Sequence, residues 1–119
     1  MRRLMPAVTA LVAAGAVAAA PALAHVDLER TSPGKGKTAK TSTRSVTVSF
    51  SGSFVTGKLT VTGPGGKVVG RGGQDPRKTS RLRAELRSGL KPGTYKATWR
   101  ILDQDGHRQN GTFTFKLRR

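Results

Sequence analysis

The chain has 119 residues, of which 22 are Lys or Arg and 6 are Asp or Glu, so its formal net charge is +16. The length allows one small domain, and the absence of cysteine excludes a disulfide framework and a cysteine-linked lipid anchor. So strong a positive charge attracts anionic partners.

The first 24 residues have the pattern of a cleaved secretory signal peptide. The basic start Met1-Arg2-Arg3 precedes an apolar stretch over residues 4–20, and Ala22-Leu23-Ala24 supplies the small residues of a cleavage site. The apolar stretch is too short and too rich in alanine for a membrane span. We therefore predict a signal peptide at 1–24 and one mature domain at 25–119, located in the periplasm or outside the cell, with a charge of 16 − 2 = +14.

Alternation of apolar and polar residues predicts strands through most of the mature domain. Residues 30–44, which are rich in Ser, Thr, Gly and Lys, are expected to form a mobile surface loop. The segment 81–87 fits a strand or a short helix. The predicted strands lie, in chain order, at 26–30, 45–51, 58–62, 67–70, 81–86, 94–101 and 112–117.

Seven short strands separated by turns predict an all-β Greek-key sandwich. Gly63-Pro64-Gly65-Gly66 and Lys91-Pro92-Gly93 supply two of the turns. The large aromatic residues could form a stacking platform for single-stranded nucleic acid. They occupy the apolar side of the alternating strands, however, so the core is the favoured interpretation, and nucleic acid is disfavoured as a partner. These residues are Phe50, Tyr95, Trp99, Phe113 and Phe115.

The only two histidines of the sequence are candidates for a metal site. His25 would become the first residue after cleavage, so its free α-amine and its ring Nδ1 could chelate one metal ion. Asp105 and His107 are two residues apart and point to the same side of an extended backbone. A plain Asp-Gly turn is the alternative interpretation of Asp105-Gly106.

The direction of the strands predicts that these residues meet. If seven strands alternate in direction, the sixth ends where the first begins, which places the loop of Asp105 and His107 beside His25. Three nitrogens and one carboxylate oxygen suit tetragonal Cu(II) better than tetrahedral Zn(II). The predicted metal ligands are therefore His25, Asp105 and His107, with one Cu(II) per chain.

The mature sequence resembles the CopC-type copper-resistance proteins of bacterial envelopes. The most specific part is Gly93-x-Tyr95-x-x-x-Trp99-Arg100, followed by Asp105-Gly106-His107. Further matching residues are Leu28, Ser32, Pro33, Val46, Val48, Phe50, Ser51, Val61, Thr62, Gly63, Pro64, Gly66, Val68, Leu90, Pro92, Gly111, Phe113 and Phe115.

The resemblance implies an immunoglobulin-like β-sandwich or barrel with a histidine-brace Cu(II) site formed by His25, Asp105 and His107. It also implies a role in carrying or buffering copper outside the inner membrane, with a CopD-like membrane copper transporter as companion. Some members carry a methionine-rich Cu(I) site, but Met1 and Met5, the only methionines here, both belong to the predicted signal peptide.

We expect a monomeric, non-enzymatic copper-binding protein. One alternative is an oxidative copper enzyme that uses the same brace, which the carboxylate ligand and the small size of the domain disfavour. The other is a polyanion-binding module of the cell envelope with incidental histidines. Weak contact with anionic envelope polymers would use the basic run of Arg77, Lys78, Arg81, Arg83, Arg87 and Lys91.

Overall fold

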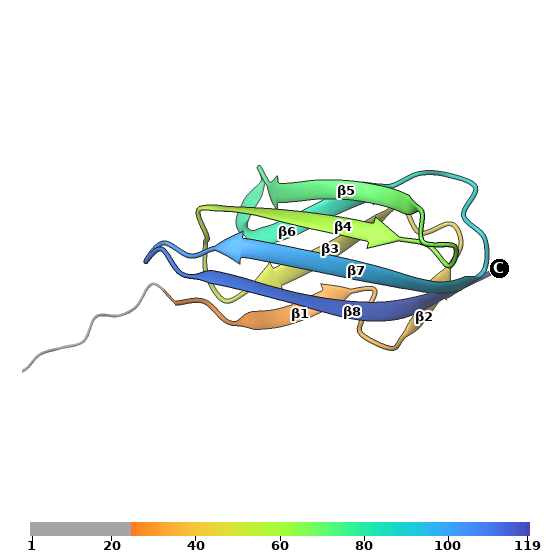
Figure 1. The fold of residues 1–119 in the computed structure, drawn as a ribbon, viewed down its shortest axis with the longest axis horizontal. Coiled ribbons are helices and arrows are strands. Elements are labelled where there is room, and N and C mark those ends of the chain that lie inside the picture. The colour runs from red at the N-terminus through yellow and green to blue at the C-terminus, as the bar shows by residue number, and fades with distance from the viewer. Residues whose placement is uncertain (1–24) are drawn as a thin grey trace, which may run out of the picture.

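The computed structural model describes residues 25–119, so the predicted signal peptide lies outside the described residues. Eight strands follow one another along the chain, connected by turns and loops (Figure 1). In this part of the chain no helix is long and apolar enough to cross a membrane. The strands are β1 (Leu28–Ser32), β2 (Thr38–Lys40), β3 (Ser45–Phe50), β4 (Thr56–Thr62), β5 (Val68–Asp75), β6 (Lys78–Leu86), β7 (Gly93–Leu102) and β8 (Arg108–Arg118).

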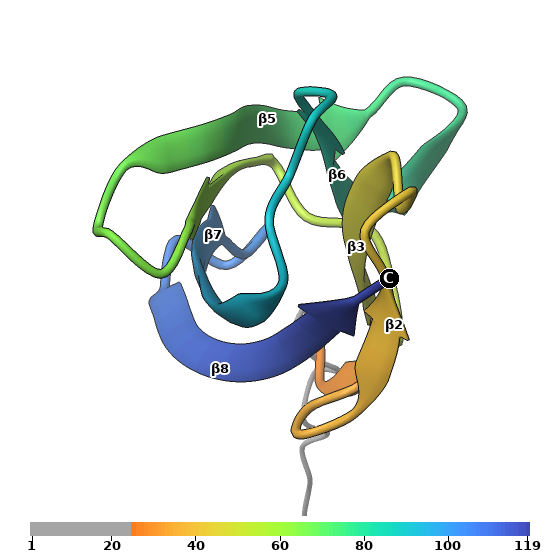
Figure 2. The same ribbon diagram turned by 90° about the vertical axis from the view of Figure 1, so that its right-hand side faces the viewer.

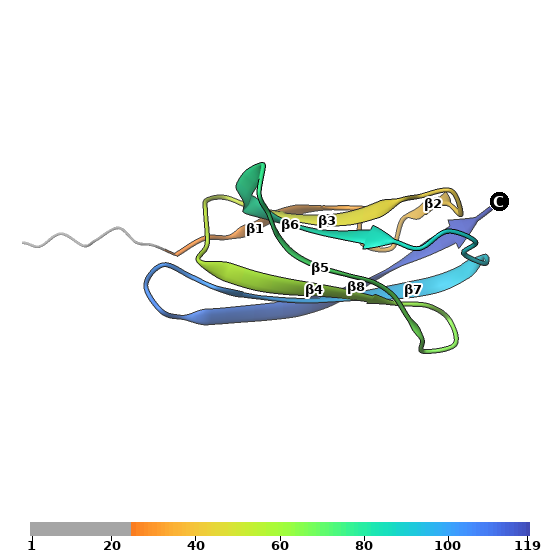
Figure 3. The same cartoon turned by 90° about the horizontal axis from the view of Figure 1, so that it is seen from above.

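The eight strands form one sheet in the order β1-β3-β6-β5-β4-β7-β8-β2. Every neighbouring pair is antiparallel except β2 and β8, which are parallel. The sheet curls over, so that β1, β3 and β6 face β4, β7 and β8 across the core (Figure 2 and Figure 3). The predicted all-β sandwich or barrel is confirmed, with eight strands in place of about seven. The segment 81–87, which fitted a strand or a helix, lies largely in β6.

The predicted loop at 30–44 is wrong in part, because it contains the end of β1 and all of β2. β2 forms the edge of the sheet and is held on β8 by backbone hydrogen bonds, and in the turn before it the Gly36 N–H donates to the Thr114 carbonyl at 2.8 Å. Three residues are too few for an alternating pattern to be recognised. Pairing of the backbone with β8, which no side-chain pattern encodes, makes this segment a strand.

The alternating residues place their apolar side chains in one core, as predicted. Trp99 is 7% exposed and packs edge-on against Phe50, with ring centroids 5.1 Å apart. Tyr95 is buried, and its hydroxyl donates a 2.6 Å hydrogen bond to the carbonyl of Lys91. The predicted core location of the aromatic residues is confirmed, because Phe113 and Phe115 are buried too.

Glycines in β5 permit the sharp curl between the two layers. A Cβ on Gly72 would stand 1.8 Å from the carbonyl oxygen of Arg83, and one on Gly70 would stand 2.6 Å from that of Glu85. β5 and β6 thus approach more closely than side chains at these positions would allow. Since β5 links β6 of one layer to β4 of the other, these contacts shape the whole sandwich.

The strand directions bring the two ends of the candidate site together. From β1 the order passes through β3, β6, β5 and β4 to β7, and each step is antiparallel, so β7 ends where β1 begins. The unforeseen β2 runs parallel to β8 and therefore in the direction of β1. It adds a strand without reversing the direction of the chain, so β7 still ends beside the start of β1, as predicted.

Candidate metal centre

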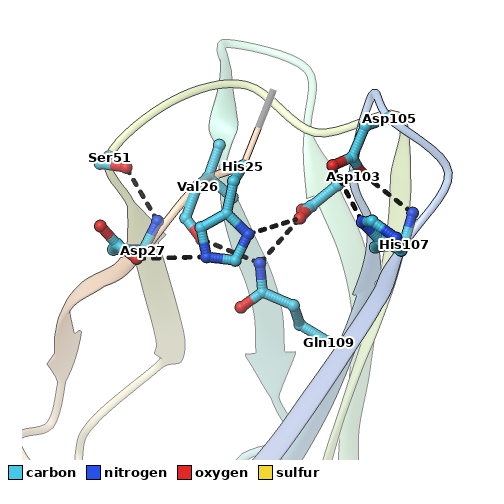
Figure 4. A network of polar contacts seen from close by, with 8 residues as sticks. All are labelled: His25, Val26, Asp27, Ser51, Asp103, Asp105, His107 and Gln109. Atoms are coloured by element: carbon cyan, nitrogen blue, oxygen red, sulfur yellow. Dashed lines mark hydrogen bonds and ion pairs between the residues drawn. The ribbon is translucent and has the colours of Figure 1, made fainter. Parts of the chain in front are cut away.

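The candidate site lies where the residues before β1 meet the loop between β7 and β8 (Figure 4). Gln109 joins the two segments, because its side-chain Nε2 donates 2.8 Å hydrogen bonds to the Val26 carbonyl and to Oδ2 of Asp103. The Asp27 backbone N–H donates to Ser51 Oγ at 2.9 Å and fixes the next residue of the terminus. These contacts hold His25 beside the loop.

The loop itself is a tight hydrogen-bonded turn. The Asp103 N–H donates to the His107 carbonyl at 2.8 Å, and the Gly106 N–H donates to the Asp103 carbonyl at 3.0 Å. Gly106 has a backbone φ of 90°, a conformation that residues other than glycine adopt only with strain. Glycine between Asp105 and His107 is therefore required by the turn.

Asp105 and His107 contact each other on the outside of this turn. The His107 N–H donates to Asp105 Oδ1 at 3.0 Å, and the ring Nδ1 of His107 lies 2.9 Å from Asp105 Oδ2. The hydrogen bond from the His107 backbone lowers the pKa of the Asp105 carboxyl, against partial desolvation, and the rings of His107 and His25 lower it further. Asp105 is thus kept as a carboxylate, the form that binds a cation.

The ring of His25 lies between two other carboxylates. Its Nδ1 is 3.6 Å from Asp103 Oδ2, and its Nε2 is 3.5 Å from Asp27 Oδ1. Asp27, Asp103 and Gln109 were not predicted from the sequence as parts of the site. Asp103 had a detectable signal, since it stands at the end of the Trp99 strand, two residues before Asp105.

Asp103 differs from the other carboxylates of the site in its burial. It is 1% exposed, and its Oδ1 has no hydrogen-bond partner among residues 25–119. A buried carboxylate oxygen without a donor is costly, because the water that it loses is not replaced. On the other side of the carboxylate, Oδ2 accepts the hydrogen bond from Gln109 and lies 3.6 Å from the ring Nδ1 of His25.

The predicted ligands lie at one end of the molecule, but in this structure their side chains do not surround a common point. Within residues 25–119 no group of three or more His, Cys, Asp or Glu side chains has an arrangement that could hold a metal ion. The side chains of His25 and His107 are 59% and 77% exposed, so both rings are free to change rotamer. The available donors are imidazole nitrogens and carboxylate oxygens, a set that suits Cu(II).

The sequence matches the CopC domain model over residues 28–118. The chain belongs to the CopC domain family. The family resemblance predicted from the sequence is therefore confirmed. Protein YobA of Escherichia coli strain K12 is 29% identical over 102 residues, a match that covers 80% of each protein.

Solved CopC structures share the fold. The crystal structure of CopC from Methylosinus trichosporium OB3b has a TM-score of 0.70 at 24% identity, covering 79% of this chain and 94% of that one. PcoC, a methionine-rich copper resistance protein from Escherichia coli, has a TM-score of 0.65 at 22% identity, covering 79% and 99% respectively. At these identities, the structural matches establish the fold.

Proposed function

We propose that this protein is an exported, non-enzymatic CopC-domain protein that binds one Cu(II) ion and carries or buffers copper outside the inner membrane. The ligands are the α-amine and ring of His25, the carboxylate of Asp105 and the ring of His107. The observation that best supports this proposal is the position of the two histidines of the sequence. They are 82 positions apart, yet they lie at the same end of the sandwich, with Asp103 between their segments.

The chemistry of this end of the molecule supports copper as the cargo. Cleavage after Ala24 gives His25 a free amine, and an amine and an imidazole on one residue close a single chelate ring. Asp105 adds negative charge to neutralise the cation. A carboxylate ligand favours Cu(II) over Cu(I), which suits storage and transfer better than a redox cycle.

Asp103 and Gln109 have a positioning role in this proposal. Gln109 fixes the carboxylate of Asp103 and the carbonyl of Val26, so the residue that carries the amine is held beside the loop. Asp103 places a negative charge 3.6 Å from the ring Nδ1 of His25, the nitrogen that would bind the metal. Residues that orient metal ligands in this way commonly change affinity by 10- to 100-fold.

The membership of the CopC family supports the assignment, since PcoC, with which this chain shares its fold, is described as a copper resistance protein. A thioether Cu(I) site is not part of the proposal, because Met1 and Met5 both precede His25. Delivery of copper to a CopD-like membrane transporter is the partner role that we infer from the family resemblance.

The test is a Cu(II) titration of the exported protein, after mass spectrometry has established that it begins at His25. Electron paramagnetic resonance then reports the nitrogen and oxygen ligands. His107→Ala and an added glycine before His25 should each weaken binding and change the spectrum, whereas a glycine added after Arg119 should do neither. Unchanged affinity and spectrum after the N-terminal addition would refute the amine ligand and, with it, the proposed site.

A further inference from the structure

The outward face of the β4, β7 and β8 layer carries an array of basic residues that the copper site does not use. Together with the adjoining β5 it presents exposed side chains of Lys58, Arg71, Lys96, Arg100, Arg108, Lys116 and Arg118. Threonines occupy most of the positions between them, and Thr60, Thr98 and Thr112 form one row across three strands. We refer to these seven basic residues as the basic face.

Within residues 25–119, Glu85 of β6 is the one acidic residue directly opposite a member of the basic face on a neighbouring strand, since it pairs with Arg71. The six carboxylates of the sequence are Asp27, Glu29, Asp75, Glu85, Asp103 and Asp105. Three of them surround the candidate metal centre, Glu29 lies on β1, and the other two form ion pairs with cations of β6. The other six basic residues of this face have no acidic residue directly opposite them on a neighbouring strand within the described part of the chain, so most of their charge is uncompensated.

The basic run predicted from the sequence is a different surface. Arg81 Nη2 lies 2.9 Å from the buried carboxylate of Asp75, and Arg83 Nη2 lies 3.3 Å from Glu85. Two of the six cations of that run are thus neutralised within the protein. Within residues 25–119 none of the seven cations of the basic face forms an ion pair, and no run of basic residues marks this face in the sequence.

Two features of the basic face fit phosphate groups. Lys58 and Arg100 are directly opposite each other on β4 and β7, an arrangement of like charges that is destabilising unless an anion lies between them. These two side chains and Arg108 line a hollow of about 340 Å³. Asn110 and Thr56 add hydrogen-bonding groups to its wall.

The charges are spread in two dimensions over the outer face of the curled sheet. At strand spacings of about 4.8 Å, the step from β5 to β8 spans about 14 Å, and Arg108 and Lys116 are about 27 Å apart along β8. Cations spread in two dimensions match a surface of phosphates better than a single linear chain. We propose that the basic face docks the protein onto an anionic phospholipid bilayer, through the phosphates of the headgroups.

Docking in this way would keep the copper site close to the membrane. Arg108 belongs to the basic face and directly follows His107, so the metal centre lies at the edge of the docked surface. The attraction should fall steeply with salt, because it acts between exposed charges.

The test is sedimentation of the purified protein with vesicles of phosphatidylcholine containing about 30% phosphatidylglycerol, at about 0.1 M salt, against phosphatidylcholine alone. The variant Lys58→Gln/Lys96→Gln/Arg100→Gln lowers the charge of the basic face and leaves the loop of His107 unaltered. At about fivefold for each lost charge, we expect vesicle affinity to fall about 100-fold.

The matched control is Lys78→Gln/Arg87→Gln/Lys91→Gln, which removes three exposed charges outside the basic face. We expect its affinity to fall less than about fivefold, since these groups lie away from the docked surface. Equal losses in the two variants would show that only net charge matters and would overturn the proposal. So would binding to soluble polyphosphate or polyglutamate without binding to the anionic vesicles.

Discussion

Replacing Asp103 with asparagine tests whether the buried carboxylate serves the metal centre or the fold. The side chain keeps its size, and its carbonyl oxygen can still accept the 2.8 Å hydrogen bond from Gln109. What is lost is the negative charge 3.6 Å from the Nδ1 of His25. The substitution therefore separates the charge of Asp103 from its place in the hydrogen-bond network.

We expect Cu(II) affinity to fall by about 10- to 100-fold, the range for residues that orient metal ligands. This corresponds to about 1.4 to 2.7 kcal/mol. The metal-free protein should unfold at the same temperature as the wild type or at a higher one. The reason is that Asp103 Oδ1 is buried without a partner, and a neutral amide is less costly there than a charged oxygen.

The assay is competition between the protein and a Cu(II) chelator of known affinity, with thermal unfolding of the metal-free form followed in parallel. Asp27→Asn is the matched control, because it removes an exposed carboxylate 3.5 Å from the other nitrogen of the same ring. Its effect should stay below about threefold, since exposed ion pairs contribute little. The reasoning is refuted if Asp103→Asn binds copper as the wild type does, or if it mainly lowers the unfolding temperature.

Three further predictions concern the scaffold. Gly72→Ala should lower the free energy of unfolding by more than about 3 kcal/mol in urea titrations, because its Cβ would stand 1.8 Å from the Arg83 carbonyl oxygen. Gly65→Ala is the control and should change the free energy of unfolding by less than about 0.5 kcal/mol, because a Cβ there would have no atom within 4 Å. Tyr95→Phe should cost about 1 kcal/mol in the same assay, since it removes the buried hydroxyl's 2.6 Å hydrogen bond, and an unchanged value would contradict this role. Hydrogen bonds from the Arg77 backbone N–H and from the Arg81 side chain lower the pKa of the Asp75 carboxyl in the folded protein. The contribution of Asp75 to the free energy of unfolding should therefore be complete above about pH 4 and be lost as the pH falls through the lowered folded pKa. Asp75→Asn should abolish that part of the acid sensitivity, which unfolding measured as a function of pH would show.

Much of the fold could be predicted because each long strand has one buried face. Tyr95, Ala97 and Trp99 in β7 alternate with exposed polar residues, as a period of two requires, and Val46 and Val48 in β3 alternate with half-buried ones. β2 could not be predicted in this way, since it depends on backbone pairing with the edge of β8. The number of strands was therefore too small by one, although their directions were right.

For the candidate site, the sequence by itself determined which chemical groups are available: two histidines, an Asp-Gly-His turn and a terminus that cleavage would convert into a chelator. Only the tertiary structure decided that Asp103, which is 78 residues away in the sequence, lies beside His25. The same holds for charge, since composition sets the excess of cations but not where it stays unpaired. Both outcomes depend on which strands become neighbours when the sheet curls, and contacts between distant segments leave no local pattern in the sequence.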